Sequence, residues 1–146
     1  MMDVMRDKIC SEARSWIGVP YMHRGRTRNG VDCIGLVVEV YRAVHGMDFG
    51  PLVYSNEPTT REVYAQLRGR ARRIAEGDVL PGDLVLMSWG DRATHFGIVT
   101  EDQVVHVSRI AGKVIAQKRG PIVLRHAVGY YRVNMPGEES VTSSLS

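Results

Sequence analysis

The sequence is poor in the features that mark several large classes of protein. It has two cysteines, Cys10 and Cys33, and neither lies in a Cys-x-x-Cys or Cys-x-x-His pair, so nothing indicates a disulfide framework or a local zinc motif. No apolar run approaches the roughly 18 residues that a membrane-spanning helix needs. An internal repeat is also lacking. For a chain of 146 residues, we expect a single globular domain.

A large excess of one charge is lacking as well. Nineteen Lys and Arg residues oppose sixteen Asp and Glu residues, and the net charge of +3 permits an anionic partner without requiring one. The densest basic stretch is RGRARR at 68–73, which has no interleaved aromatic residues and matches no nucleic-acid-binding motif. We interpret it as a solvated helix end and loop, and we expect no nucleic-acid partner.

Both ends of the sequence carry weak signals. The first ten residues, MMDVMRDKIC, lack the succession of charged, apolar and small residues that forms a secretory signal. We therefore expect the protein to be made in the cytoplasm and to reach the outside only if another component delivers it. Residues 136–146 are small and polar, which predicts a flexible tail after a domain that spans 1–135.

The chain does contain helical patterns followed by strand patterns. Apolar residues recur every three or four positions over 3–17 and 32–46, which predicts two helices, the second apolar enough to lie at the centre of the fold. Thr59 and Glu62 have capping-box spacing, which predicts a short helix over 59–69. Six short runs rich in β-branched residues follow: LVLMS, HFGIV, QVVHV, KVIAQ, PIVLR and VGYYRV. This order predicts an α+β domain whose antiparallel sheet packs on the central helix.

The candidate catalytic group is the thiol of Cys33. Asp32 is a preferred N-cap residue, so Cys33 is predicted to lie in the first turn of the central helix. The unpaired backbone N–H groups and the helix dipole favour a thiolate there, and the same N–H groups could stabilise an oxyanion. Without partner residues, an inert buried cysteine beside a capping aspartate would be the better interpretation.

Two histidines are the candidate partners of this thiol. His95 opens the run HFGIV, and His106 lies within QVVHV. A turn centred between Thr100 and Glu101 would pair the two runs as a hairpin and place the imidazoles directly opposite each other on one face. His95 would then act as the base for Cys33 and His106 as the group that orients it, although geometry alone also permits the reverse assignment.

A metal site is the alternative use of the same three residues. Together they could bind Zn²⁺ as three ligands with an open fourth position. We favour the metal-free interpretation and expect no cofactor, because a thiol at a helix N-terminus is activated without a metal. The other histidines are interpreted as surface or hydrogen-bonded core residues: His23, His45 and His126.

Five segments taken together resemble the NlpC family of cell-wall cysteine peptidases, whose fold is a circularly permuted form of the papain fold. They are ARSWIGVPYMHRG, DCIGLV, LPGDLVLM, HFGIV and VVHVS, in that order. Within the family, the chain looks most like the short single-domain branch encoded in phage-tail and gene-transfer-agent clusters. The resemblance implies hydrolysis of peptidoglycan stem peptides, at the γ-D-glutamyl-diaminopimelate bond in typical members. It also implies action at the cell wall after delivery by a tail assembly.

The resemblance implies roles for individual residues as well. It makes Cys33 the nucleophile, His95 the general base and His106 the third polar member of the triad. Tyr21 matches a tyrosine that supports the oxyanion or the substrate in the family. Asp32 matches an acidic residue that helps bind the free amino group of the stem in some members.

Two departures from the family pattern flank the expected site. Ile34 replaces the serine that is common after the cysteine, and Arg24 stands where many members have a glycine. Both departures affect the expected choice of stem peptide more than they affect the expected catalytic triad. Other functions stay open: a structural tail-assembly protein with a vestigial site, a thiol amidase or acyltransferase, and DNA binding through 68–73. Whether residues 46–58 form a lid over the site is also open.

Overall fold

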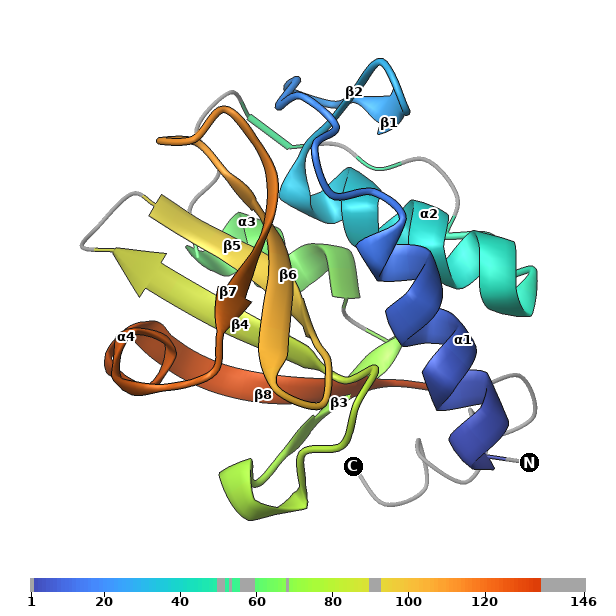
Figure 1. The fold of residues 1–146 in the computed structure, drawn as a ribbon, viewed down its shortest axis with the longest axis vertical. Helices are drawn as coiled ribbons and strands as arrows, with labels where there is room; N and C mark the ends of the chain where they lie inside the picture. The colour runs from blue at the N-terminus through green and yellow to red at the C-terminus, as the bar shows by residue number, and fades with distance from the viewer. Residues whose placement is uncertain are drawn as a thin grey trace.

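A computed structural model describes residues 2–49, 52, 54–55, 60–67, 69–89 and 93–134. These ranges form a mixed α+β domain, as predicted (Figure 1). The helices are α1 (Met2–Arg14), α2 (Cys33–His45), α3 (Thr60–Leu67) and α4 (Pro121–His126), with a 3-10 turn at Glu76–Asp78. The strands are β1 (Arg26–Thr27), β2 (Gly30–Val31), β3 (Ala71–Ile74), β4 (Leu84–Trp89), β5 (Ala93–Val99), β6 (Gln103–Ser108), β7 (Lys113–Lys118) and β8 (Ala127–Val133).

The main sheet is antiparallel and has a different set of helices on each face. Its strands follow the order β3-β8-β4-β5-β6-β7, while β1 and β2 form a separate two-stranded ribbon. Helices α1 and α2 lie side by side on one face, and α4 packs on the other (Figure 1). Because successive side chains of a strand point to opposite faces, each strand contributes to both layers.

The larger hydrophobic core lies between α2 and the sheet. Leu36 and Val40 of α2 are fully buried, as are Ile9 and Ala13 from the predicted stripe of α1. Burial of such side chains is the main favourable term in folding, at roughly 1.5–3 kcal/mol each. The central position predicted for the second helix is therefore confirmed, and the core holds its N-terminus against the middle of the sheet.

The PGD segment before β4 ties distant elements together. Asp83 is buried, and its carboxylate accepts hydrogen bonds from Arg6 of α1 at 3.2 Å and from Arg132 of β8 at 2.8 Å. Tyr41 of α2 donates its hydroxyl hydrogen to the carbonyl of Gly82. A buried carboxylate is tolerated only when it is paired and hydrogen-bonded in this way. The motif thus has a structural role that fixes α1, α2 and β8 around one turn.

One predicted strand is wrong. Residues 121–125 form helix α4 because Pro121 takes the first helical position, where a missing N–H costs nothing. Val123 turns inward toward the second face of the sheet, whereas Ile122 and Leu124 are exposed. The β-branched composition of this stretch therefore misled the strand prediction.

The basic stretch also differs from its prediction. Residues 71–73 are part of β3, which pairs with β8 at the edge of the sheet, rather than a helix end and loop. The guanidinium of Arg73 donates to the carbonyl of Val128 at 3.1 Å. Positive charge on an edge strand discourages pairing with other chains, which gives this stretch a physical role without nucleic acid.

Some predictions lie outside the described residues, namely the tail at 136–146 and the capping residue Thr59. Glu62, the other member of the predicted capping box, accepts hydrogen bonds from the backbone N–H and hydroxyl of Ser55 at 2.9 and 3.0 Å. In the ranges that the structure covers, no helix is long and apolar enough to span a membrane.

Candidate active site

The site is built around the first turn of α2. Asp32 has extended backbone angles and caps the helix, and its Oδ1 accepts a hydrogen bond from the Gly35 N–H at 2.8 Å. Cys33 is consequently the first helical residue, as predicted. The thiol therefore lies where the backbone N–H groups of a first helical turn have no partner within the helix.

The second oxygen of the Asp32 carboxylate anchors two loops. Its Oδ2 accepts a hydrogen bond from the backbone N–H of Arg24 at 2.7 Å and another from the hydroxyl of Tyr54. Arg24 has a φ of 63°, in the left-handed region that favours glycine. Asp32 is buried, and the donors of the chain itself occupy both of its oxygens. Its binding of a substrate amino group stays a prediction.

The sulfur of Cys33 lies against strand β5. The backbone N–H of Phe96 lies close enough to the sulfur to lower the pKa of the thiol, as do the N–H groups of Ile34 and of Cys33 itself. The β5–β6 ladder reaches only as far as the pair Gly97–His106, so the N–H of Phe96 lies just beyond the last paired residues. The sulfur therefore lies next to the segment of β5 that carries His95.

The protonation state expected for Cys33 differs in the structure. Burial, followed by the negative charge of Asp32, raises the pKa of the thiol to about 12, although the N–H groups of Phe96, Ile34 and Cys33 act in the opposite direction. The sequence analysis considered only the helix terminus, which favours the thiolate. The loss of water around the sulfur outweighs that effect, so the resting site holds a neutral thiol.

The histidine register also requires a correction. Val99 pairs with Val104, and His106 lies opposite Gly97 rather than His95. The turn is centred one residue later than predicted, because the Thr100 N–H donates to the Gln103 carbonyl at 2.8 Å and extends the ladder by one pair. The shift keeps both imidazoles on the same face but makes them diagonal neighbours. His95 also pairs with Met87, which places it on the side of the sheet that α4 covers.

The diagonal arrangement brings the two rings into direct contact. Their centroids are 5.1 Å apart with an interplanar angle of 12°, and His95 Nε2 lies 3.1 Å from His106 Nδ1. His106 Nε2 lies 2.9 Å from Gln117 Oε1 of β7. An amide oxygen can only accept, so His106 donates from Nε2 and accepts at Nδ1. His95 then donates from its Nε2 and keeps Nδ1 as its basic nitrogen.

Both histidines are held in the neutral form. Burial, the neighbouring His106 and the charge of Arg109 lower the pKa of His95 to about 3. Burial also lowers the pKa of His106, while its hydrogen bond to Gln117 has the opposite effect. The neutral imidazole is the form in which His95 can accept a proton during a reaction.

An open groove of about 380 Å³ begins at the two histidines. Its lining comes mainly from β6, β7 and the turn between them, with one residue from α4: His95, His106, Ser108, Arg109, Ile110, Ala111, Ile115, Gln117 and Ile122. The lining combines four apolar residues with the two imidazoles, the neutral polar groups of Ser108 and Gln117, and the cation of Arg109. The groove has the size of a small-molecule or short-peptide site.

Tyr21 lies at the rim of this region. Its backbone pairs with Val31, just before Asp32, and its N–H donates to the carbonyl of Gly112 at 2.8 Å. The guanidinium carbon of Arg109 lies 5.3 Å from the centroid of the Tyr21 ring. The structure thus places Tyr21 beside both the nucleophile segment and the groove, and its role toward an oxyanion stays a prediction.

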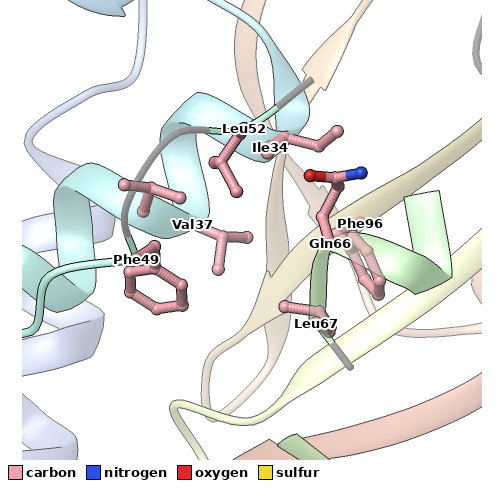
Figure 2. Close-up of a pocket in the computed structure, with 8 residues that line it drawn as sticks. Ile34, Val37, Phe49, Leu52, Gln66, Leu67 and Phe96 are labelled. Atoms are coloured by element: carbon pink, nitrogen blue, oxygen red, sulfur yellow. The ribbon is translucent and has the colours of Figure 1, made fainter. Parts of the chain in front are cut away.

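A second, much smaller cavity lies behind the nucleophile, between α2, the segment after it, α3 and β5. Figure 2 shows its mainly apolar lining, which includes Ile34 and Phe96, with the amide of Gln66 of α3 drawn between them. Its volume of about 10 Å³ leaves room for about one water. The residues on both sides of the Cys33 sulfur are therefore supported by packed apolar side chains, and substrate-sized space is found in the groove instead.

The remaining sequence hypotheses meet mixed outcomes. Within the part of the chain that the structure describes, no three His, Cys, Asp or Glu side chains are arranged to hold a metal ion. Residues 46–58, for which the sequence left a lid role open, fall partly outside the described residues, but Tyr54 packs at the site and its carbonyl accepts a hydrogen bond from Arg24 at 2.8 Å. Sequence reasoning missed Tyr54, Gln117 and Arg109. Strand alternation could have placed Gln117 on the His106 face, but only with the correct register.

Comparison with known families decides the relationship. The model of the NlpC/P60 family matches residues 18–132, which include every residue of the site described above. The chain belongs to the NlpC/P60 family. The family likeness inferred from the five segments is confirmed, while the phage-tail branch is not tested by this match.

Curated relatives of this NlpC/P60 chain come from Escherichia coli K12. Murein DD-endopeptidase MepS/Murein LD-carboxypeptidase is 28% identical over 118 residues, which cover 80% of this chain and 57% of the relative. Probable endopeptidase NlpC is 33% identical over 104 residues, which cover 69% of this chain and 60% of the relative. The chain thus spans less than two thirds of the length of these relatives.

Solved NlpC/P60 structures share the fold. The NlpC/p60 domain of peptidoglycan hydrolase SagA superposes with a TM-score of 0.63 at 24% identity, covering 87% of this chain and 97% of that domain. RipD from Mycobacterium tuberculosis, described as a non-catalytic NlpC/p60 domain protein, superposes with a TM-score of 0.59 at 15% identity, covering 87% and 95%. One architecture therefore serves both hydrolytic and non-catalytic members.

Proposed function

We propose that the chain is a cysteine endopeptidase that hydrolyses peptidoglycan stem peptides at the γ-D-glutamyl-diaminopimelate bond. The observation that carries the proposal is the placement of Cys33 beside the segment of β5 that bears His95, from which hydrogen bonds run through His106 to Gln117. This arrangement supplies a nucleophile, a base and an orienting group. The murein substrate in the name of the relative MepS supports the choice of substrate class.

The protonation states favour proton transfer during attack over a preformed ion pair. His95 Nδ1 takes the thiol proton as the Cys33 sulfur bonds to the γ-glutamyl carbonyl carbon. The N–H groups of the first turn of α2, with Tyr21, stabilise the resulting oxyanion. Collapse of this intermediate breaks the C–N bond, and His95 returns the proton to the leaving amine. Water, deprotonated by His95, then hydrolyses the thioester and restores the free thiol.

Delivery to the wall is a separate part of the proposal. The likeness of ARSWIG and DCIGLV to the phage-tail branch supports an enzyme that a tail assembly carries to the cell wall. Co-purification of the chain with tail proteins from induced particles would support this delivery. Its absence from intact particles would contradict it and leave the enzymatic proposal untouched.

The central test is a parallel digestion of diaminopimelate-type peptidoglycan by the wild type and by Cys33→Ala. We expect new γ-D-glutamyl termini, identified by mass spectrometry, with the wild type alone. Cys10→Ala is the matched control, because Cys10 is a buried thiol of α1 and its removal should leave the products unchanged. Equal cleavage by Cys33→Ala, with its fold verified by circular dichroism, would exclude Cys33 as the nucleophile.

A non-catalytic role is the second candidate, and the raised pKa of Cys33 favours it. The protein would then bind peptidoglycan or serve tail assembly without turnover. Sedimentation with peptidoglycan and no new termini from any variant would support this candidate. An amidase or acyltransferase would instead be revealed by product mass, because hydrolysis adds water and transfer adds the acceptor group.

A further inference from the structure

The groove beside the histidines contains a cation, Arg109, that forms no ion pair with any residue the structure describes. Arg109 is exposed at its rim, and among the residues that the structure covers its contact is the face of the Tyr21 ring. The groove lining includes no aspartate or glutamate. Arg109 nevertheless acts on the reacting end of the groove, since its charge contributes to the lowered pKa of His95.

This geometry has consequences for the chemistry of a ligand. A guanidinium presents N–H donors in a fixed fork that matches a carboxylate, and an aromatic face beneath it limits its orientation. The apolar neighbours Ile115 and Ile122 would exclude part of the water around such a pair and strengthen it. A ligand in this groove gains most if it combines apolar carbons with a carboxylate.

We propose that Arg109 forms a subsite for a carboxylate that flanks the scissile bond of the substrate peptide, and that the enzyme prefers stems in which this carboxylate is free. The inference rests on the proposed function and adds a basis for selectivity to it. In a γ-linked glutamyl residue the α-carboxylate branches off the backbone within a few bonds of the scissile carbonyl, and diaminopimelate offers further carboxylates on the other side. Amidation removes the charge at either place without changing the length of the peptide.

Binding to the inactive Cys33→Ala protein tests the subsite without requiring cleavage. Three probes are compared by isothermal titration: L-Ala-γ-D-Glu-diaminopimelate, the same peptide amidated at the glutamate α-carboxylate, and the same peptide amidated on diaminopimelate. We expect one amidation to weaken binding about 5-fold or more, the scale of a lost hydrogen-bonded charge pair at a partly solvated site. The amidation that does so identifies the carboxylate that is recognised.

Two double variants assign the effect to Arg109. In Cys33→Ala/Arg109→Gln the preference for the free carboxylate should disappear, whereas Arg109→Lys should keep part of it. Lys113→Gln in the same background is the matched control. It removes one exposed positive charge from the same hairpin outside the groove lining, and the preference should persist.

The outcomes separate the inference from the proposed function. Equal binding of the three peptides, binding of none, or an unchanged preference after Arg109→Gln overturns the carboxylate subsite. Absence of cleavage by the wild type contradicts the endopeptidase proposal alone, because the binding differences still decide whether Arg109 recognises a carboxylate.

Discussion

At the scale of single residues, the site consists of neutral groups whose roles depend on the direction of their hydrogen bonds. Gln117 is the last residue in the series of hydrogen bonds that runs from His95 through His106. Its amide oxygen determines which nitrogen of His106 carries the proton. Through the 3.1 Å contact between the rings, that choice decides which nitrogen of His95 stays basic. Gln117 is therefore expected to be a positioning residue of the reaction.

The substitution Gln117→Met tests this role because it retains side-chain length and removes the acceptor. We expect His95 and His106 to carry their protons on Nε2 in the wild type and His106 to show a mixture of tautomers in the variant, measured by long-range ¹H–¹⁵N correlation spectra. Turnover should fall about 10-fold with little change in KM, the scale of losing a supporting hydrogen bond. Gln103→Met on β6 is the control. A rise in KM at unchanged kcat would instead assign Gln117 to substrate contact.

At the scale of elements, the position of the thiol depends on how closely α2 approaches the preceding loop. A Cβ on Gly35 would lie 2.2 Å from the carbonyl oxygen of Gly25, which is shorter than any allowed contact. The absence of a side chain thus lets the first turn of α2 lie against the loop that Asp32 anchors through Arg24. The N-terminal turn and this loop behave as one unit.

We expect the substitution Gly35→Ala to move the first turn of α2 away from the loop that Asp32 anchors. Overpacking should lower the free energy of unfolding by about 1–3 kcal/mol, and displacement of Cys33 should reduce turnover further than the loss of folded protein explains. Urea denaturation and peptidoglycan digestion measure the two effects. Gly77→Ala is the control, since its Cβ would meet no atom within 4 Å. Wild-type stability in Gly35→Ala would contradict the close approach seen in the structure.

At the scale of the whole molecule, the sheet separates the nucleophile from most of the substrate groove. Helix α2 delivers Cys33 from one face, and His95 belongs to the face that α4 covers. Both residues lie near the point where the β5–β6 ladder stops at Gly97 and His106. Cys33 and His95 are both ionisable and lie inside the domain, so the free energy of unfolding of the whole fold depends on pH.

Stability should therefore fall in acid. The pKa of His95 is lowered from 6.5 to about 3 in the folded protein, so the unfolded chain binds more protons between these values and stability decreases as the pH falls through this window. Above about pH 6.5 the histidine is neutral in both the folded and the unfolded state, so it no longer makes the free energy of unfolding depend on pH. Urea unfolding at pH 7 and pH 5 should show a smaller loss for His95→Gln than for the wild type. Parallel losses in the two proteins would exclude His95 as a cause.

The sequence by itself determined the local features of this protein. Helix capping depends on neighbours within one turn, so Asp32 and Cys33 could be placed at the start of α2, and apolar periodicity identified the buried stripes of α1 and α2. Strand patterns found most of the sheet. They failed at 121–125, where composition favours a strand and Pro121 begins a helix.

Only the tertiary structure decided the features that depend on contacts across the chain. The register of His95 and His106 followed from how Thr100 and Gln103 close their turn, which spacing alone does not specify. Gln117 and Arg109 entered the site because β7 and its turn lie beside β6. The raised pKa of Cys33 came from burial against β5. Desolvation and charge depend on everything that surrounds a group in three dimensions, and the residues that supply them are far apart in sequence.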